Sequence, residues 1–377
     1  MEVRIGDSIE CNPTVKLVKG NEYPLIDIDK ITVGRKLVTN KDTIVYEKQS
    51  GCKFQNGDTL MARITPCLEN GKMAMASIPD KGIGSTELFV FRGKKGITDN
   101  DFVYYFLKQS YIRNLAANSM TGASGRQRAD LKFIKKIKFD LPSLPTQQKI
   151  AAILSTYDRL IENNTRRIRL LEQMAENLYK EWFVRFRFPE HEKVEMVNGL
   201  PKGWKINSLK EICEFKRGRN ITSAEMCDGV IQVISAGITP SGYHNKANVH
   251  GVSVTMSSSG ANAGYISIHY DDIWAADCSY ISEKETEDIY YVYELLNNIR
   301  QVINNFQIGA AQPHVYPKDI NRIKTCVPPK ELRIKANANL SKIHKEIHKL
   351  YKQNQLLTRQ RDLLLPRLMS GKLEVKS

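Results

Sequence analysis

The sequence lacks the patterns that mark several large classes of protein. Its seven cysteines are scattered, odd in number and never arranged as a C-x-x-C pair. This argues against a disulfide framework and a zinc site, and it is typical of a reducing cytoplasm. No apolar run approaches the roughly 20 residues that a membrane-spanning helix needs, and MEVRIGDSIE at the start has no signal-peptide core. We therefore expect a cytoplasmic protein with no membrane partner.

Motifs for catalysis are also missing. The sequence has no G-x-x-x-x-G-K-[S/T] phosphate loop. The string closest to an amino-methyltransferase motif, CVPPK at Cys326 to Lys330, lacks the amide and the aromatic residue and fits a turn before a helix. PEHEK at Pro189 to Lys193 resembles the carboxylates and lysine of metal-dependent nucleases, but it lies in a charged linker. We expect no catalytic residue, no metal ligand and no cofactor bound by this chain.

Positive charge is what the chain does have. Its 377 residues carry a formal net charge of +15, with a pI near 9.3. A basic balance of this size favours a polyanionic partner, most often nucleic acid, although a solvated basic surface without a ligand is the alternative. The length suggests two or three domains.

One amphipathic segment dominates the middle of the chain. From Thr146 to Phe183 there is no Gly or Pro, and apolar residues recur at steps of three and four. Such a pattern predicts a helix of these 38 residues, about 57 Å long, with one narrow apolar seam. A seam that long requires a partner helix, as in a coiled coil. Its predicted members are Ile150, Ile153, Tyr157, Leu160, Ile168, Leu171 and Leu178.

The partner helix is predicted from Lys330 to about Met369, within an internal duplication. Residues 131–183 align without a gap on residues 317–369, a shift of 186, and 13 of the 53 positions are identical. Asn164 and Asn354 would be polar residues in the seam, where they can fix register. Pro366 would end or kink the second helix. The predicted seam of that helix contains Leu340, Ile343, Ile347, Leu350, Leu357 and Leu364.

Two β-rich segments of mixed pattern precede the two helices. Each holds short strand-like runs separated by Gly, Asn, Asp and Pro, then a helical stretch at 99–115 or 288–306. LKFIKKIKFDLP at 131–142 alternates as a strand does. The predicted fold is α+β, with α/β domains at 1–143 and 187–328 and long antiparallel helices at 144–186 and 329–377. A repeated scaffold with differing domains suggests two readers of two targets.

Several loops carry the residue types that DNA recognition requires. Lys and Arg contact phosphates, whereas Arg, Asn, Gln, Ser and Thr also reach base edges. Any one of these side chains could instead be solvated or form a turn. The candidates in the first domain are Arg63, Thr65, Asn70, Lys72, Arg126, Gln127 and Arg128. Those in the second are Lys216, Arg217, Arg219, Asn220, Ser257, Ser258, Ser259, Asn262, Gln312 and His314.

The order of four strings resembles the specificity subunit of type I restriction–modification systems. These are LPSLPTQQKIAAIL (141–154), LPKGWKINSLKEI (200–212), IGAAQPHV (308–315) and LLLPRLMSGKLEV (363–375). The chain departs from the family pattern because its first domain has no LPxGW lead and its TGASGRQR loop lacks Gln-Pro-His. Neither departure removes an element that the architecture needs.

The resemblance implies a non-catalytic subunit. Its two target recognition domains would each read one half of a bipartite site in double-stranded DNA. The helices would space the domains and dock two adenine methyltransferase subunits, and restriction/translocase subunits would join for cleavage. S-adenosylmethionine, ATP and Mg²⁺ would then be bound by these partners. The alternatives are a stand-alone DNA nuclease, a fragment of a fused restriction–methylation enzyme, and a coiled-coil adaptor without DNA specificity.

Overall fold

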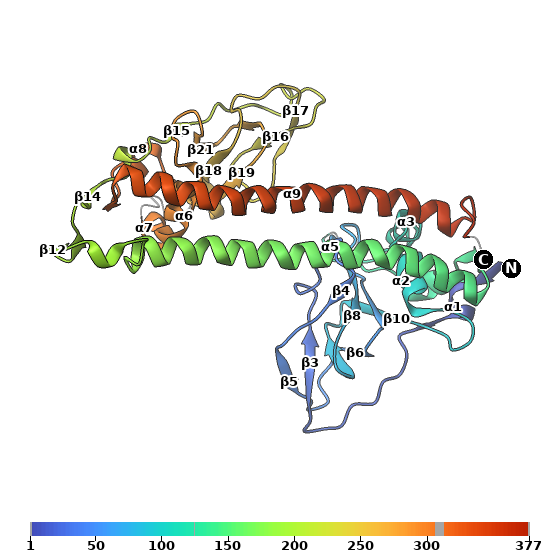
Figure 1. The fold of residues 1–377 in the computed structure, drawn as a ribbon. Helices are drawn as coiled ribbons and strands as arrows, with labels where there is room; N and C mark the ends of the chain where they lie inside the picture. Colours follow the sequence, from blue (N-terminus) through green and yellow to red (C-terminus); the bar gives the residue numbers. More distant parts are fainter. Residues whose placement is uncertain (1, 124, 306–312, 376–377) are drawn as a thin grey trace. The chain divides into compact units, whose positions relative to one another are not determined.

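The computed structural model describes residues 2–123, 125–305 and 313–375, which form two compact units. Unit 1 contains residues 1–165 and 352–377, and unit 2 contains residues 166–351. The two long helices, α5 (Leu144–Tyr179) and α9 (Lys330–Met369), each contribute one part to each unit (Figure 1). Each unit is therefore closed by segments from distant parts of the sequence.

Unit 1 is built on two main sheets. One has the strand order β2-β10-β7-β8-β4, and the other has the order β5-β3-β9-β6. All residues of β7 and β8 are buried, as expected for strands covered on both faces, and α2 packs against β7, β8 and β10 (Figure 1). The strands are β1 (Glu2–Arg4), β2 (Ile9–Cys11), β3 (Glu22–Ile26), β4 (Leu37–Val38), β5 (Thr43–Val45), β6 (Cys52–Gln55), β7 (Thr59–Ala62), β8 (Met73–Ala76), β9 (Lys81–Gly84), β10 (Leu88–Gly93) and β11 (Lys138–Asp140).

The short helices of unit 1 differ from the prediction in two places. The single helix expected over residues 99–115 is interrupted at Gln109, whose ψ of 134° separates α2 (Asn100–Lys108) from α3 (Ser110–Asn118). The prediction of a strand over residues 131–142 is mostly wrong, because α4 (Leu131–Lys136) occupies the first half of this segment. Asp130 caps α4 by accepting a hydrogen bond from the backbone N–H of Lys132 at 2.8 Å. The remaining short helix is α1 (Ile5–Ser8).

Unit 2 repeats this plan with other strands. Its sheets have the orders β15-β21-β18-β19 and β17-β16-β20. The strands are β12 (Met196–Val197), β13 (Leu200–Pro201), β14 (Lys205–Ser208), β15 (Lys216–Arg217), β16 (Ile231–Ile234), β17 (Gly242–His244), β18 (Ser253–Ser257), β19 (Ile266–His269), β20 (Ile273–Ala275), β21 (Cys278–Ser282) and β22 (Lys324–Val327). The helices are η1 (Lys180–Val184), η2 (His191–Lys193), η3 (Leu209–Glu211), η4 (Gly260–Asn262), α6 (Ile289–Asn298), α7 (Arg300–Asn304) and α8 (Pro317–Asn321).

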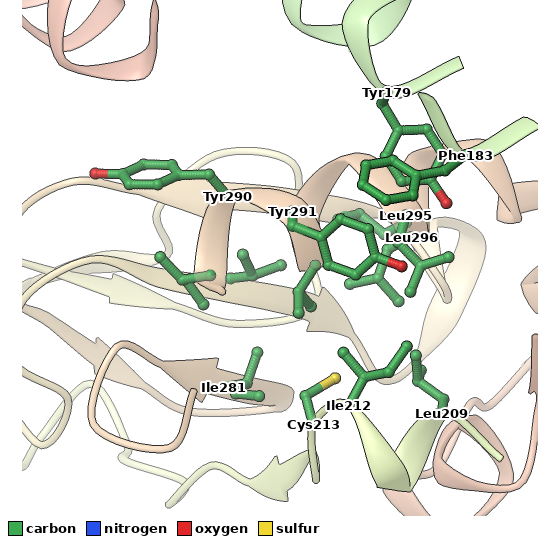
Figure 2. Packing of buried hydrophobic residues seen from close by; sticks show 14 of the residues in the cluster. Tyr179, Phe183, Leu209, Ile212, Cys213, Ile281, Tyr290, Tyr291, Leu295 and Leu296 are labelled. Atoms are coloured by element: carbon green, nitrogen blue, oxygen red, sulfur yellow. The ribbon is translucent and has the colours of Figure 1, made fainter. Parts of the chain in front are cut away.

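Aromatic side chains join α6 to the end of α5 in unit 2. Figure 2 shows Tyr179 and Phe183 lying against Tyr291, with ring centroids 5.7 and 4.8 Å from the Tyr291 centroid. The π-helix η1 continues α5 by one wider turn and places Trp182 and Phe183 in this core. The helix predicted to reach Phe183 therefore ends as an α-helix at Tyr179.

The predicted internal duplication is confirmed by the backbone contacts that close each unit. In unit 1, β1 pairs antiparallel with β11, and Ile5 N–H donates to Ile137 O at 2.9 Å. In unit 2, β14 pairs antiparallel with β22, and Leu209 N–H donates to Ile323 O at 2.8 Å. The acceptors are separated by 323 − 137 = 186 residues, which is the shift that aligns the helices.

The seam of unit 1 differs from the predicted one. Ile153 and Leu160 were placed in it, but they are 36% and 47% exposed, so these two assignments are wrong. Tyr157 is half-buried. The buried positions nearest to these three residues are Leu154, Asp158 and Asn164, which lie one to four residues further along the helix. An apolar pattern cannot identify this seam, because two of its buried residues are polar.

Polar contacts join the two helices within unit 1. The guanidinium of Arg361 donates to the buried carboxylate of Asp158, which also accepts from the Tyr105 hydroxyl. Asn164 Nδ2 donates to Asn354 Oδ1 at 3.0 Å and to Gln353 Oε1 at 3.1 Å. The predicted seam positions of Asn164 and Asn354 are therefore confirmed. Of the predicted apolar members in this unit, Ile150 is buried, whereas Leu357 and Leu364 are half-buried.

The seam of unit 2 is mainly apolar. Ile168, Ile347 and Leu350 form one buried cluster, against which Leu171 and Ile343 pack. Leu340 belongs to the core of unit 2 that also contains Tyr179, Phe183 and Tyr291, and half-buried Leu178 packs against this core. Pro366, which was expected to end or kink the second helix, is accommodated three residues before its end at Met369. No helix in the described part of the chain is long and apolar enough to cross a membrane.

Candidate nucleic-acid interface

Two candidate loops from distant parts of the sequence lie side by side in unit 1. Thr65 N–H donates to Gln127 O at 3.0 Å, and Ala129 N–H donates to Arg63 O at 2.8 Å. Between these bonds, Ile64 and Arg128 form an isolated antiparallel bridge. The loop after β7 and the loop before α4 therefore present their polar side chains together, as base reading by several side chains requires.

Unit 2 contains the same arrangement. Gly260 N–H donates to Pro313 O at 3.0 Å, Val315 N–H donates to Ser258 O at 3.0 Å, and Ser259 forms a bridge with His314. Residues 313 and 315 lie 186 positions after residues 127 and 129, and residues 258 and 260 lie 195 positions after residues 63 and 65. Each of these hydrogen bonds in unit 2 therefore has an equivalent in unit 1. The duplication thus includes the candidate loops, and position 314 corresponds to position 128.

A carboxylate lies beside each loop pair, and neither carboxylate was predicted from the sequence. Glu87 directly precedes β10, and Asp277 directly precedes β21. The two places are equivalent, because the first residue of β10, Leu88, pairs with the last residue of β7, Ala62, and the first residue of β21, Cys278, pairs with the last residue of β18, Ser257. Neither carboxylate has a local sequence signal, since each partner is distant in sequence.

Each carboxylate holds a candidate residue. Glu87 accepts hydrogen bonds from Arg128, and this contact holds the pKa of the Glu87 carboxyl below its usual value. Asp277 accepts from Arg217 and, at 2.5 Å, from the hydroxyl of Ser259. Glu87 therefore orients a cationic donor in unit 1, and Asp277 orients a cationic and a hydroxyl donor in unit 2.

Six of the candidate side chains belong to residues that are exposed to solvent and available to a ligand. They are Asn70, Arg126, Lys216, Arg217, Arg219 and Asn220. Lys216 also forms an ion pair with Glu285 at 3.0 Å, and Arg219 accepts the Trp274 indole N–H through its carbonyl at 2.8 Å. Gln312 lies outside the described residues. The half-buried candidates are Arg63, Thr65, Lys72, Gln127, Arg128, Ser259, Asn262 and His314.

The serines at the end of β18 are corrected. Ser257 and Ser258 are predicted from the sequence as DNA-binding residues, but they are only 4% and 0% exposed. The Ser257 hydroxyl donates inward to Ala236 O at 2.9 Å. Their position explains the error, because Ser257 is the last residue of a fully buried strand, Ser258 follows it in the interior, and the loop first reaches the surface at Ser259.

Three half-buried candidates of unit 1 make contacts within the fold. The Arg63 guanidinium lies 4.9 Å from the ring centroid of Phe89, and Lys72 Nζ donates to Ile28 O at 3.0 Å. The Thr65 hydroxyl donates to Glu69. No group of three or more His, Cys, Asp and Glu residues that could hold a metal ion is found among the described residues.

Comparisons with known proteins agree with this arrangement. Residues 2–173 and 201–362 match the family model of the type I restriction modification DNA specificity domain. The chain is 24% identical to the type I restriction enzyme MjaVIII specificity subunit of Methanocaldococcus jannaschii, over 100% of this chain and 93% of the relative. It is 26% identical to the MjaIX specificity subunit of the same organism, over 75% of this chain and 71% of that relative.

A solved structure shows the same fold. The crystal structure of a type I restriction–modification system S subunit from M. genitalium has a TM-score of 0.61 and 18% identity, covering 98% of this chain and 96% of that one. The two matched segments of the family model correspond to the two halves of the duplication. The chain therefore belongs to the family of type I restriction–modification DNA specificity subunits, and it is a DNA sequence-recognition subunit with two recognition domains.

Proposed function

We propose that each unit reads one half of a bipartite DNA target and so directs adenine methylation and restriction by partner subunits. The observation that supports this is the repeated loop pair, which has the same backbone hydrogen bonds in both units but different side chains. Equal scaffolds with unequal contact residues are what a protein needs to recognise two unlike half-sites. The net charge of +15 supplies the attraction to phosphates.

The partners of this chain are proposed to be two adenine methyltransferase subunits and, for cleavage, restriction/translocase subunits. S-adenosylmethionine, ATP and Mg²⁺ would belong to them, and this chain would itself be non-catalytic and act in the cytoplasm. Exposed apolar side chains on α5 and α9 support docking of other subunits, because large apolar residues in water favour burial at an interface. They include Leu160, Leu170, Met174, Leu356 and Leu363.

The main test is genome-wide mapping of methylated adenine in cells with and without the gene. We expect one split motif to lose methylation on deletion and to regain it when the gene is returned on a plasmid. If every methylated motif survives deletion, the proposal is wrong. Cleavage or methyl transfer by the purified chain alone would instead favour the rival enzyme.

Domain exchange tests whether the units read bases. Lys205 pairs with Val327, so a segment of residues 205–327 begins and ends at neighbouring points. Glu2 pairs with Asp140, which makes residues 2–140 the matching segment of unit 1. Replacing either segment with that of a relative should change one half of the methylated motif and leave the other half unchanged. An unchanged motif would favour an adaptor without base specificity.

A further inference from the structure

Arg128 is held by Glu87 in a way that leaves part of its guanidinium free. Arg128 Nε donates to both Glu87 oxygens at 2.9 and 3.0 Å, and Nη2 donates to Oε1 at 2.6 Å. Nη1 donates to the Arg126 carbonyl at 3.3 Å. A guanidinium has five N–H donors, so one N–H remains on each terminal nitrogen. The side chain is 42% exposed, compared with 23% for Glu87.

Glu87 engages the edge of the guanidinium formed by Nε and Nη2, so the orientation of the group is fixed and its remaining donors are on the two terminal nitrogens. A fork of two parallel N–H groups matches the O6 and N7 acceptors that guanine presents in the major groove. Binding to a pre-oriented arginine costs less side-chain entropy than binding to a free one. Phosphate can be bound by a point charge, as lysine binds it, whereas reading the two acceptors of guanine requires an oriented pair of donors.

In unit 2 the position equivalent to Arg128 holds a different residue, although the hydrogen bonds of the loop pair and the neighbouring carboxylate are present in both units. Position 314 corresponds to 128 by the shift of 186, and it holds His314, whose ring lies parallel to Tyr316 with centroids 5.8 Å apart. The carboxylate is retained as Asp277, but it binds Arg217 and Ser259 instead. The same place in the two loop pairs therefore offers a guanidinium fork in one unit and an imidazole in the other.

We propose that Arg128, oriented by Glu87, determines specificity by reading one guanine in the half-site of unit 1. This inference rests on the proposed function, because it presupposes that unit 1 reads a half-site. Glu87 is then a positioning residue, which acts through Arg128.

The test uses the full chain in complex with its methylation subunits and DNA that carries the mapped motif. Each guanine in the half-site of unit 1 is replaced in turn by 7-deazaguanine, which lacks N7. We expect about tenfold weaker binding at one guanine only, the size of a lost base contact. In Arg128→Ala, unmodified DNA should bind at least about tenfold more weakly, and 7-deazaguanine should cause no further loss.

Two variants separate base reading from a structural or phosphate role. Arg126→Ala removes an exposed arginine of the same loop, so it should weaken binding equally for all sequences and leave the sensitivity to 7-deazaguanine unchanged. Glu87→Gln should reduce discrimination at that guanine while the complex still binds. Discrimination within the half-site of unit 2 is the internal control for folding and should not change in any variant.

The inference is overturned if the half-site of unit 1 contains no guanine, or if Arg128→Ala retains full sensitivity to 7-deazaguanine. In both cases the split motif itself still exists, so the proposed function stands. If the proposed function fails, by contrast, deletion of the gene removes no split motif, and no base position is discriminated. The two failures are therefore distinguishable.

Discussion

Replacing Lys108 with methionine should stabilise unit 1 at neutral pH. Lys108 ends α2, its Nζ is buried, and it has no hydrogen-bond partner within the described residues. Nζ lies 5.6 Å from the ring centroid of Tyr104. Burial, followed by the charge of Arg361, lowers the pKa of Lys108 from 10.5 to about 8. Folding therefore places an ammonium group where its charge is disfavoured.

The size of the effect follows from this difference in pKa. At about 1.36 kcal/mol per pKa unit, the change from 10.5 to about 8 corresponds to a cost of about 3 kcal/mol. Above pH 10.5 the amine is neutral in both states, and the cost is absent. As the pH falls toward 8, the unfolded chain takes up a proton that the folded chain does not, so the folded state loses stability. Below pH 8 the cost is complete, and methionine should remove most of it.

Hydrogen exchange measured by mass spectrometry on α2 peptides is the appropriate assay. All three tryptophans (Trp182, Trp204 and Trp274) belong to unit 2, so their fluorescence does not report directly on unit 1. Lys149→Met is the matched control, because Lys149 is exposed, and a change within about 0.5 kcal/mol is expected there. The reasoning is refuted if Lys108→Met destabilises α2 at pH 7, or if its gain is undiminished at pH 10.

Other predictions concern the two helices. Asn164→Leu should cost about 1–3 kcal/mol by leaving the Asn354 amide unsatisfied, and adding Asn354→Ile should recover most of this loss in thermal unfolding. Arg361→Leu should reduce the free energy of unfolding of unit 1 by about 3–5 kcal/mol, because it leaves the buried carboxylate of Asp158 unpaired. Hydrogen exchange of unit 1 measures this loss. Inserting seven residues after Thr165 and seven before Lys352 adds about 10 Å to each helix, and methylation mapping should show a longer gap between unchanged half-sites.

The long helices could be predicted from sequence because their determinants are local. The second helix begins at Lys330 and ends at Met369, as expected from a segment without glycine. The order of residues along the seam was less predictable. Asp158 and Arg361 are buried because they pair with each other, and a rule that places apolar residues inside excludes them. The predicted seam consequently includes Ile153 and Leu160, which are exposed in the structure.

The candidate site was predictable in its loops but not in its internal contacts. Arg128 was identified from residue type, and the loop that contains it does lie beside the loop of Arg63. Glu87 was missed because 41 residues separate it from Arg128, and only the strand order of the sheet brings them together. Ser257 and Ser258 show the reverse error, since polar serines near glycines resemble an exposed loop although both are buried at the end of a strand.

The two halves of the duplication have different seam residues at the positions of Asn164 and Asn354, and this difference has a structural consequence. Under the shift of 186, Asn164 corresponds to Leu350, and Asn354 to Ile168. The hydrogen-bonded amide pair of unit 1 is thus replaced by an apolar contact in unit 2. Sliding one helix by a heptad would replace Asn354 opposite Asn164 with Ile347 or Arg361. Neither side chain has an acceptor for the Asn164 amide, so the amide pair would be lost, at a cost of about 1–3 kcal/mol. An apolar seam alone would tolerate such a slip more easily. The amide pair therefore selects one register of α5 against α9.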